Sequence, residues 1–156
     1  MGKIKISRLT ENNLNQLMEL VELFNEVFDE PHTLASEQQL KELLNKPDFH
    51  ALASIKDDTV VGGLTAYELK KYHSDKSELY IYDIAVKPQF QNQGIGKNLI
   101  GFLKEYAMKN EIETIFVEAH SKDEDAVRFY KSTFGESEKV DLFSFNIKTK
   151  DYTPKS

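Results

Sequence analysis

Apolar residues recur along the chain at two spacings, which predict both strands and helices. Ile4 and Ile6 alternate with polar neighbours within residues 3–8, as in a short strand. From residue 11 the spacing becomes helical, and Pro31 ends that pattern because proline cannot continue a helix. The sequence Ser36-Glu37-Gln38-Gln39 resembles a capping box and predicts a second, short helix that runs through Leu44.

The remaining pattern alternates between strands and helices. Residues 49–55 and 60–69 are strand-like, and the polar residues Lys56–Thr59 between them indicate a hairpin. The order β-α-α-β-β-β-α-β-α-β predicts an α/β fold with a mixed sheet, in one domain of residues 1–148 followed by a polar tail, 149–156. The later elements are expected at residues 78–86 (strand), 95–106 (helix), 114–117 (strand), 123–131 (helix) and 140–147 (closing strand).

Composition narrows the function classes. The 156 residues are 40% hydrophobic and 29% charged, which suits one globular domain with a real core. The absence of cysteine excludes disulfides, thiolate metal sites and a cysteine nucleophile. No stretch approaches the roughly 20 apolar residues of a membrane span, and none reads as a signal peptide, so we expect a cytoplasmic protein with no membrane partner. The formal charge of −6 argues against nucleic acid and favours a cationic partner.

Two sets of side chains have simple structural interpretations. The histidines share no metal-ligand spacing, so no metal is expected, and His32, His50 and His73 read as loop or strand-surface residues. Tyr80 and Tyr82 fall on one face of a strand, and core packing explains them adequately.

A glycine-containing loop, Gln91–Lys97, follows a strand pattern and precedes a helix pattern. A Rossmann fingerprint would need glycine at Leu99, and a P-loop would need glycine at Gln91 and Ser or Thr at Asn98. The remaining pattern, Gln-x-x-Gly-x-Gly, lets backbone N–H groups approach a diphosphate at a helix N-terminus. A plain turn that starts a helix explains the same residues.

The motifs together resemble the GNAT superfamily of N-acetyltransferases. They are Ala85-Val86-x-Pro88, Gln91-x-x-Gly94-x-Gly96 and Ala126–Tyr130, in this order. The resemblance implies a single-domain fold with a mixed sheet, a splayed pair of parallel strands and about four helices, and acetyl-CoA as co-substrate. The residues that it implies for acetyl-CoA binding are Ile84, Ala85, Val86, Gln91, Asn92, Gln93, Gly94, Ile95, Gly96, Lys97 and Asp123.

A closer similarity is to aminoglycoside 3-N-acetyltransferases of type I. It rests on Phe49–Ala53, Val60–Tyr67 and Glu78–Val86 and extends over most of residues 4–147. Two features depart from the wider family. Asp123 stands where asparagine is usual, and the turn that ends at Gly135 is one residue longer than Tyr-x-x-x-Gly.

The resemblance assigns catalytic roles to two side chains. Asp83 would take a proton from the acceptor amine or anchor its ammonium, although an aspartate bound to backbone at a bulge would look the same. Tyr130 would protonate the leaving thiolate, or its ring would cap the core. The backbone N–H at Ile84 would polarise the thioester carbonyl. Asp123 would contact the pantetheine or, as the simpler role, cap a helix.

Acidic residues cluster where the resemblance places the acceptor. A polycationic amine would be attracted there, most simply an aminoglycoside, and otherwise a polyamine or a protein lysine. The alternative for the acidic residues is a solvated face, and the alternative to an enzyme is a non-catalytic acyl-CoA sensor. The expected last strand is apolar enough to pair across a homodimer. The expected acceptor-site residues are Asp29, Glu30, Asp83, Glu118 and His120.

Overall fold

A computed structural model describes residues 2–29 and 33–147 of the chain. The chain forms two compact units, residues 1–118 and 119–156. The first unit contains β1 (Lys5–Arg8), η1 (Glu11–Asn13), α1 (Leu14–Phe28), α2 (Glu37–Leu44), β2 (Phe49–Lys56), β3 (Thr59–Lys70), β4 (Ser77–Val86), η2 (Pro88–Phe90), α3 (Ile95–Lys109) and β5 (Ile112–Val117).

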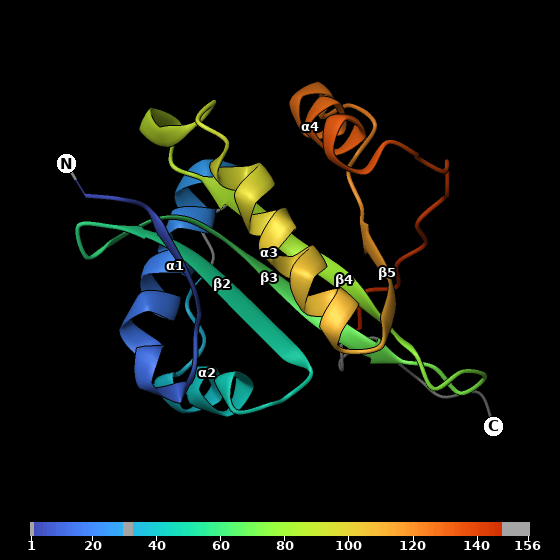
Figure 1. Cartoon of the computed structure of the whole chain (residues 1–156), viewed down its shortest axis with the longest axis horizontal. Helices are drawn as coiled ribbons and strands as arrows, with labels where there is room; N and C mark the ends of the chain where they lie inside the picture. The colour runs from blue at the N-terminus through green and yellow to red at the C-terminus, as the bar shows by residue number, and fades with distance from the viewer. Residues whose placement is uncertain (1, 30–32, 148–156) are drawn as a thin grey trace. The chain divides into compact units, whose positions relative to one another are not determined.

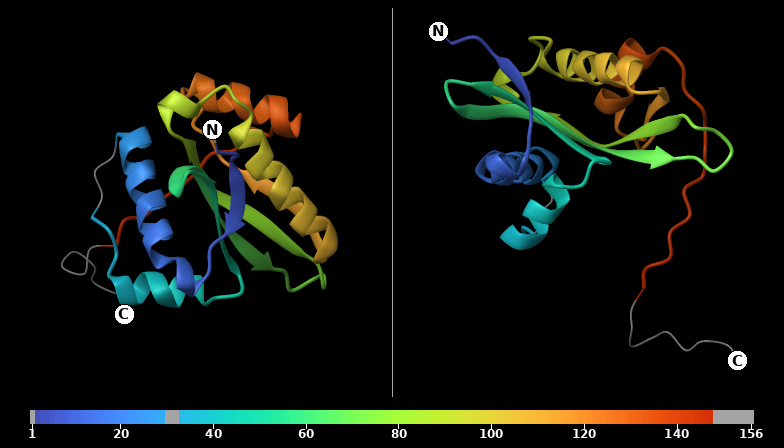
Figure 2. Two further views of the ribbon diagram at one scale, coloured as in Figure 1. Left: turned by 60° about the vertical axis from the view of Figure 1, so that its left-hand side comes forward. Right: turned by 60° about the horizontal axis from the view of Figure 1, so that its bottom comes forward.

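The five strands form one mixed sheet in the order β1-β2-β3-β4-β5 (Figure 1). Neighbouring strands are antiparallel from β1 to β4, whereas β4 and β5 are parallel and are connected through α3. Helices α1 and α2 lie on one side of the sheet and α3 lies on the other (Figure 2). The predicted mixed α/β fold with parallel strands is therefore confirmed.

Local sequence signals explain several boundaries. The Ser36 hydroxyl accepts a hydrogen bond from the Gln39 N–H at 3.2 Å, which caps α2 as predicted. Asp57 and Asp58 both have positive φ, at 49° and 61°, which matches the two-residue hairpin turn that the right-handed twist of β2 and β3 requires. Helix α1 ends at Asp29, which adopts the left-handed conformation at φ 51°.

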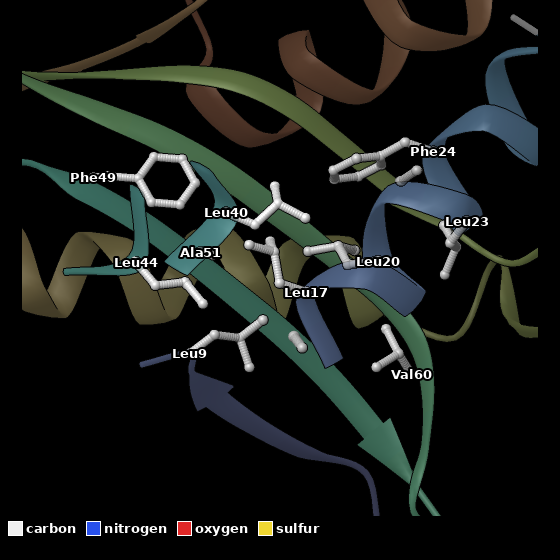
Figure 3. Close-up of a cluster of buried hydrophobic side chains, with 12 residues drawn as sticks. Leu9, Leu17, Leu20, Leu23, Phe24, Leu40, Leu44, Phe49, Ala51 and Val60 are labelled. Atoms are coloured by element: carbon white, nitrogen blue, oxygen red, sulfur yellow. The ribbon is translucent and has the colours of Figure 1, made fainter. Parts of the chain in front are cut away.

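The main core lies between α1, α2 and the sheet (Figure 3). The Glu19 carboxylate of α1 also accepts a hydrogen bond from the Val60 N–H of β3 at 3.1 Å, which fixes the helix against the strand. On the other face, α3 buries Leu99, Ile100 and Leu103. The largest side chains of the first core are Leu9, Leu17, Leu20, Leu23, Phe24, Leu40, Leu44 and Phe49.

His50 lies in the core, so its interpretation as a surface residue was wrong. The side chain is 1% exposed because α3 covers the face of β2 opposite α1. Its ring contacts Tyr106 of α3 at 4.8 Å, and its Nε2 lies 3.6 Å from a carboxylate oxygen of Glu68. Burial, then the nearby charge of Arg8, lower the pKa of His50. Apolar alternation does not predict this placement, because both faces of β2 are buried.

The second unit contains α4 (Glu124–Phe134). Gly135 ends this helix at φ 87°, and its N–H donates to the Lys131 carbonyl oxygen, so the longer turn becomes an extra part of the helix. The predicted closing strand at 140–147 is wrong: residues 135–147 form neither helix nor strand. Apolar alternation alone does not make a strand, which also needs a neighbouring backbone to bond.

Gly63 of β3 lies where α1 comes closest to the sheet. A Cβ at this position would lie 2.5 Å from Cδ1 of Leu20 and 2.5 Å from the Leu52 carbonyl oxygen. We expect Gly63→Ala to lower the free energy of unfolding by about 1–3 kcal/mol, because the core would be overpacked. Urea unfolding followed by circular dichroism measures this loss.

The matched control is Gly101→Ala within α3, where a Cβ meets nothing within 4 Å. This substitution should raise stability by about 0.5–1 kcal/mol through helix propensity. Equal effects of the two substitutions would contradict the close approach of α1 and β3.

Candidate active site

Strand β4 continues past the end of β5, which stops at Val117. The ladder between β3 and β4 continues to the Gly62–Val86 pair, but the parallel ladder between β4 and β5 ends at Ile81–Val117. The next residue, Tyr82, is an extra residue with no partner in β3, which makes a β-bulge. Bulges bend a strand and increase its twist. The edge of β4 that faces away from β3 is therefore not bonded to β5 beyond Ile81.

The bulge also decides which side chains face α1. Asp83 pairs with Thr65, and two residues earlier on β3, Gly63 packs under α1. Because paired residues and every second residue share a face, Asp83 and Ala85 lie on the α1 side of the sheet. Ala85 belongs to the core under α1. Asp83 thus lies on the part of β4 that extends beyond the end of β5.

The loop after β4 is held by its own side chains and backbone. The Gln91 side-chain amide donates to the Val86 carbonyl oxygen at 3.0 Å. Asn92 adopts the left-handed conformation at φ 62°. Helix α3 then starts at Ile95, which is 4% exposed and anchors the first turn in the core. The helix N-terminus therefore lies close to the end of β4 in sequence and is fixed there.

The loop fits a diphosphate. Gly94, the N-cap of α3, has φ 82°, and no side chain caps this helix end. A Cβ at Gly94 would meet nothing within 4 Å, so the space beside this residue is open. Such N–H groups, together with the positive end of the helix dipole, bind anions. The backbone of this loop would provide such a site, and the Gln91–Val86 hydrogen bond fixes the start of the loop against the end of β4.

Carboxylates and tyrosines converge beside Asp83. Burial, then the charge of Glu118, raise the pKa of Tyr80, with further contributions from Tyr82, Asp83 and a hydrogen bond to Glu118. Burial and the charges of Tyr82 and Asp83 likewise raise the pKa of Tyr67. Two predicted acceptor-site residues, Asp83 and Glu118, therefore both contribute negative charge at Tyr80, and Glu118 also shares a hydrogen bond with it. Their combined charge makes this surface attractive to cations.

Two other predicted acceptor residues do not join this group. Asp29 is exposed at the end of α1 and is not among the carboxylates that raise the pKa of Tyr67 or Tyr80. Glu30 lies outside the described residues.

Tyr82 is exposed, which corrects its interpretation as a core residue. Its side chain is 61% exposed because the bulge removes it from the regular ladder. The ring contacts Tyr67 at 5.8 Å and Tyr80 at 6.1 Å between centroids. No signal in the sequence marks the position of a bulge inside an apolar strand, so the exposure could not be predicted.

Three predicted residues belong to the second unit. The Asp123 carboxylate accepts a hydrogen bond from the Ala126 N–H at 3.1 Å, which makes it the N-cap of α4. The ring of Tyr130 contacts Phe129 at 5.5 Å and Phe134 at 6.2 Å within the same helix. His120 precedes α4 and is exposed.

Within residues 2–29 and 33–147, no cluster of three or more His, Cys, Asp or Glu side chains is placed to hold a metal ion. None of the helices in this part of the chain has the length and apolar character of a transmembrane segment.

Several solved structures are similar to this chain. The aminoglycoside acetyltransferase meta-AAC0020, from an uncultured soil metagenomic sample, is 37% identical with a TM-score of 0.90, and the match covers 93% of this chain and 97% of that one. It has been solved with trehalose and with sisomicin. The aminoglycoside acetyltransferase HMB0005, also from an uncultured soil metagenomic sample, is 33% identical, with a TM-score of 0.82 and coverage of 94% and 99%.

A third structure supports the fold alone. Aminoglycoside N-acetyltransferase AAC(6')-Iy in complex with CoA is 13% identical, with a TM-score of 0.79 and coverage of 94% and 96%. The sequence profile of the acetyltransferase (GNAT) family matches residues 17–135, which include the bulged strand, the loop and α4. The chain therefore belongs to the acetyltransferase (GNAT) family and is an acetyl-CoA-dependent N-acetyltransferase.

Proposed function

We propose that this enzyme transfers the acetyl group of acetyl-CoA to a primary amine of an aminoglycoside, at the 3-N position. The observation that carries the proposal is the position of Asp83 on the part of β4 that extends beyond β5, with Glu118 as a second negative charge that acts on Tyr80 of the same strand. Aminoglycosides carry several ammonium groups, which such a surface attracts. The similarity to aminoglycoside acetyltransferases at 37% and 33% identity supports the same acceptor class.

Acetyl-CoA would bind along the part of β4 that extends beyond the end of β5. The loop Gln91–Lys97 would hold the pyrophosphate through backbone N–H groups at the start of α3. The backbone of Ile84–Val86, which is not bonded to β5, would pair with the pantetheine arm. The Ile84 N–H would then donate to the thioester carbonyl oxygen, where negative charge develops during attack.

Asp83 would act on the acceptor amine. Removing the proton from an amine with a pKa of about 10.4 costs about 4–5 kcal/mol at pH 7. A carboxylate beside the reacting nitrogen can take the proton, which typically contributes a factor of about 10² to 10⁴. The same carboxylate can hold the ammonium before the proton leaves.

Tyr130 would protonate the leaving thiolate. Proton transfer from a phenol of pKa about 10 to a thiolate whose thiol has a pKa of about 8.5 is uphill by about 2 kcal/mol, so Tyr130 would act mainly as a hydrogen-bond donor, and solvent would replace any proton that it gives up. Its ring contacts within α4, to Phe129 and Phe134, would hold the hydroxyl in one orientation. Asp123 would support this role by fixing the start of the same helix.

The experiment that tests the proposed acceptor is a thiol-release assay with acetyl-CoA. Gentamicin, spermidine and a lysine peptide are compared at equal amine concentration, and the acetylated nitrogen of the product is located by NMR. Gentamicin should have the highest kcat/KM, with the acetyl group on the 3-N position. A preference for spermidine or the peptide would overturn the acceptor, and no thiol release with any amine would indicate an acyl-CoA sensor.

The cofactor loop predicts unequal effects of two substitutions. Gly94→Val should weaken CoA binding by about tenfold or more, because a branched side chain at φ 82° is strained and fills the open space before the helix. Gln91→Ala removes one neutral hydrogen bond and should weaken binding by about two- to tenfold. Calorimetric titration of CoA measures both, and unchanged affinity in a folded Gly94→Val protein would remove the loop from the cofactor site.

Tyr130→Phe separates the proton donor from the packing ring. The substitution keeps the ring, so the melting temperature should stay the same, while kcat falls by about tenfold or more. Tyr72→Phe removes the hydroxyl of a fully exposed loop residue and serves as the control. If pre-steady-state kinetics show that chemistry limits turnover and kcat is unaltered, solvent must protonate the thiolate.

Asp83→Asn should leave CoA affinity unchanged and lower kcat/KM for aminoglycosides by about 10²-fold or more. Asp75→Asn, in the exposed loop between β3 and β4, makes the same charge change and should have no effect. Native kcat/KM of Asp83→Asn on every amine tried would remove both proposed roles of Asp83.

Salt should also distinguish the acceptors. Between about 0.05 and 0.5 M salt the Debye length shrinks from roughly 14 to 4.5 Å, by square-root scaling of about 10 Å at 0.1 M. Raising salt over this range should lower kcat/KM for an aminoglycoside more than for an amine with one charge. Equal losses would show that the acidic surface does not attract the acceptor.

A further inference from the structure

Five aromatic rings form a continuous strip across the sheet beside Asp83. The strip consists of Phe49 on β2, Tyr67 on β3, Tyr82 and Tyr80 on β4, and Phe116 on β5. Successive ring centroids are 5.2, 5.8, 6.1 and 4.9 Å apart. The last contact, between Tyr80 and Phe116, is parallel within 7°. The strip follows register pairs of the sheet, Phe49 with Tyr67, Tyr67 with Tyr80, and Tyr80 with Phe116.

Exposure changes sharply along the strip. Phe49 is 5% exposed under α2, whereas Tyr82 is 61% exposed. Tyr82 is the extra residue of the bulge, and both of its ring contacts are edge-on, at interplanar angles of 79° and 73°. The neighbouring rings therefore hold Tyr82 in one orientation without covering its whole surface. A large aromatic side chain held in this way is suited to contact a ligand.

The charges around the strip indicate what that ligand is. Asp83 follows Tyr82 directly and shares its face of the sheet. Burial, then the charges of Glu118, Tyr82 and Asp83, raise the pKa of Tyr80, and burial, then the charges of Tyr82, Asp83 and Asp48, raise that of Tyr67. Carboxylates near an exposed aromatic ring favour a cation and repel phosphate or carboxylate groups. A flat ring also offers contact area to another rigid ring, whereas a flexible chain would lose conformational entropy on ordering there.

We propose that Tyr82 is a specificity-determining residue that packs against an amine-bearing ring of the acceptor, and so selects cyclic aminosugars or aminocyclitols over linear polyamines. The inference rests on the proposed aminoglycoside acceptor and adds the element that discriminates between polycations of similar charge. The carboxylates attract any polycation, but only a ring can cover the face of Tyr82 while its ammonium groups reach Asp83 and Glu118.

The test compares a cyclic and a linear polycation on four variants. Sisomicin and spermidine are each titrated by calorimetry into the CoA complex of Tyr82→Ala, Tyr82→Leu, Tyr82→Phe and Tyr72→Ala, and KM and kcat for sisomicin are measured in parallel. Tyr72 is a fully exposed tyrosine in the loop between β3 and β4, and it contacts only the ring of His73 among aromatic neighbours, so it is the matched control.

Tyr82→Ala and Tyr82→Leu should raise Kd and KM for sisomicin by about 3- to 30-fold with little change in kcat, because the packing of the acceptor ring on the aromatic face is lost. Leucine keeps apolar bulk without the aromatic face, so it should not rescue binding, whereas Tyr82→Phe should bind within about twofold of the native protein. Spermidine should change by less than about twofold in all variants. A general loss of structure would instead weaken both amines and CoA together.

Two failures are distinguishable. If the native protein neither binds nor acetylates sisomicin, the proposed acceptor fails and this inference fails with it. If the native protein acetylates sisomicin but Tyr82→Ala binds it equally well, or loses spermidine to the same degree, only the role of Tyr82 is overturned.

Discussion

Strand β4 is bonded along its whole length to β3 but only along its first half to β5. The ladder with β5 ends at Ile81, and the bulge begins at the next residue, Tyr82. Strand β5 itself ends at Val117, the partner of Ile81, so the bulge lies at the start of the part of β4 that extends beyond β5. The crossover then returns through α3, whose N-terminus begins nine residues after β4 ends. Ligands of open α/β sheets bind beyond the carboxyl ends of strands, where such a helix end is available.

The same extra residue, Tyr82, brings its own side chain to the face of the sheet that also carries Asp83, where the acceptor is proposed to bind. Without the bulge, strict alternation would place Tyr82 and Asp83 on opposite faces of the sheet. With it, the Tyr82 ring contacts Tyr67 and Tyr80 on the face that Asp83 also shares. The fold accepts an exposed tyrosine and an acidic group inside an apolar strand there. Local departures of this kind are expected at functional sites, where regular packing is given up for access.

The sequence predicted what depends on local chemistry. Three such features are the Ser36 cap of α2, the aspartate turn between β2 and β3, and the glycine at the start of α3. Each has a residue type that is strongly preferred in that local conformation. Features that depend on distant neighbours were not predictable. His50 is buried because α3 covers a second face of β2. Residues 140–147 alternate in polarity but form no strand, because a strand also needs a neighbouring backbone to bond.

The bulge lies between these cases. Asp83 within an apolar strand signalled an irregular position, but the extra residue in the ladder is Tyr82, and only the register shows it. The sequence therefore indicated which strand and which loop carry the candidate site. The direction of each tyrosine, and with it the aromatic strip, came from the register.

An acidic chain that is proposed to bind both an anion and a polycation faces opposite electrostatic demands, and the two proposed sites lie on opposite faces of the sheet. The side chain of Val86 lies near Ile95, on the α3 face, since a Cβ on Gly62 would touch both. On this face the proposed diphosphate site uses backbone N–H groups and a helix dipole, so it needs few basic side chains. Asp83 and the tyrosines lie on the α1 face. The net charge of −6 can therefore serve the cationic acceptor without excluding the anionic co-substrate, because each ligand would meet a different face of the same strand and their reacting groups would meet only at the edge that β5 leaves unbonded.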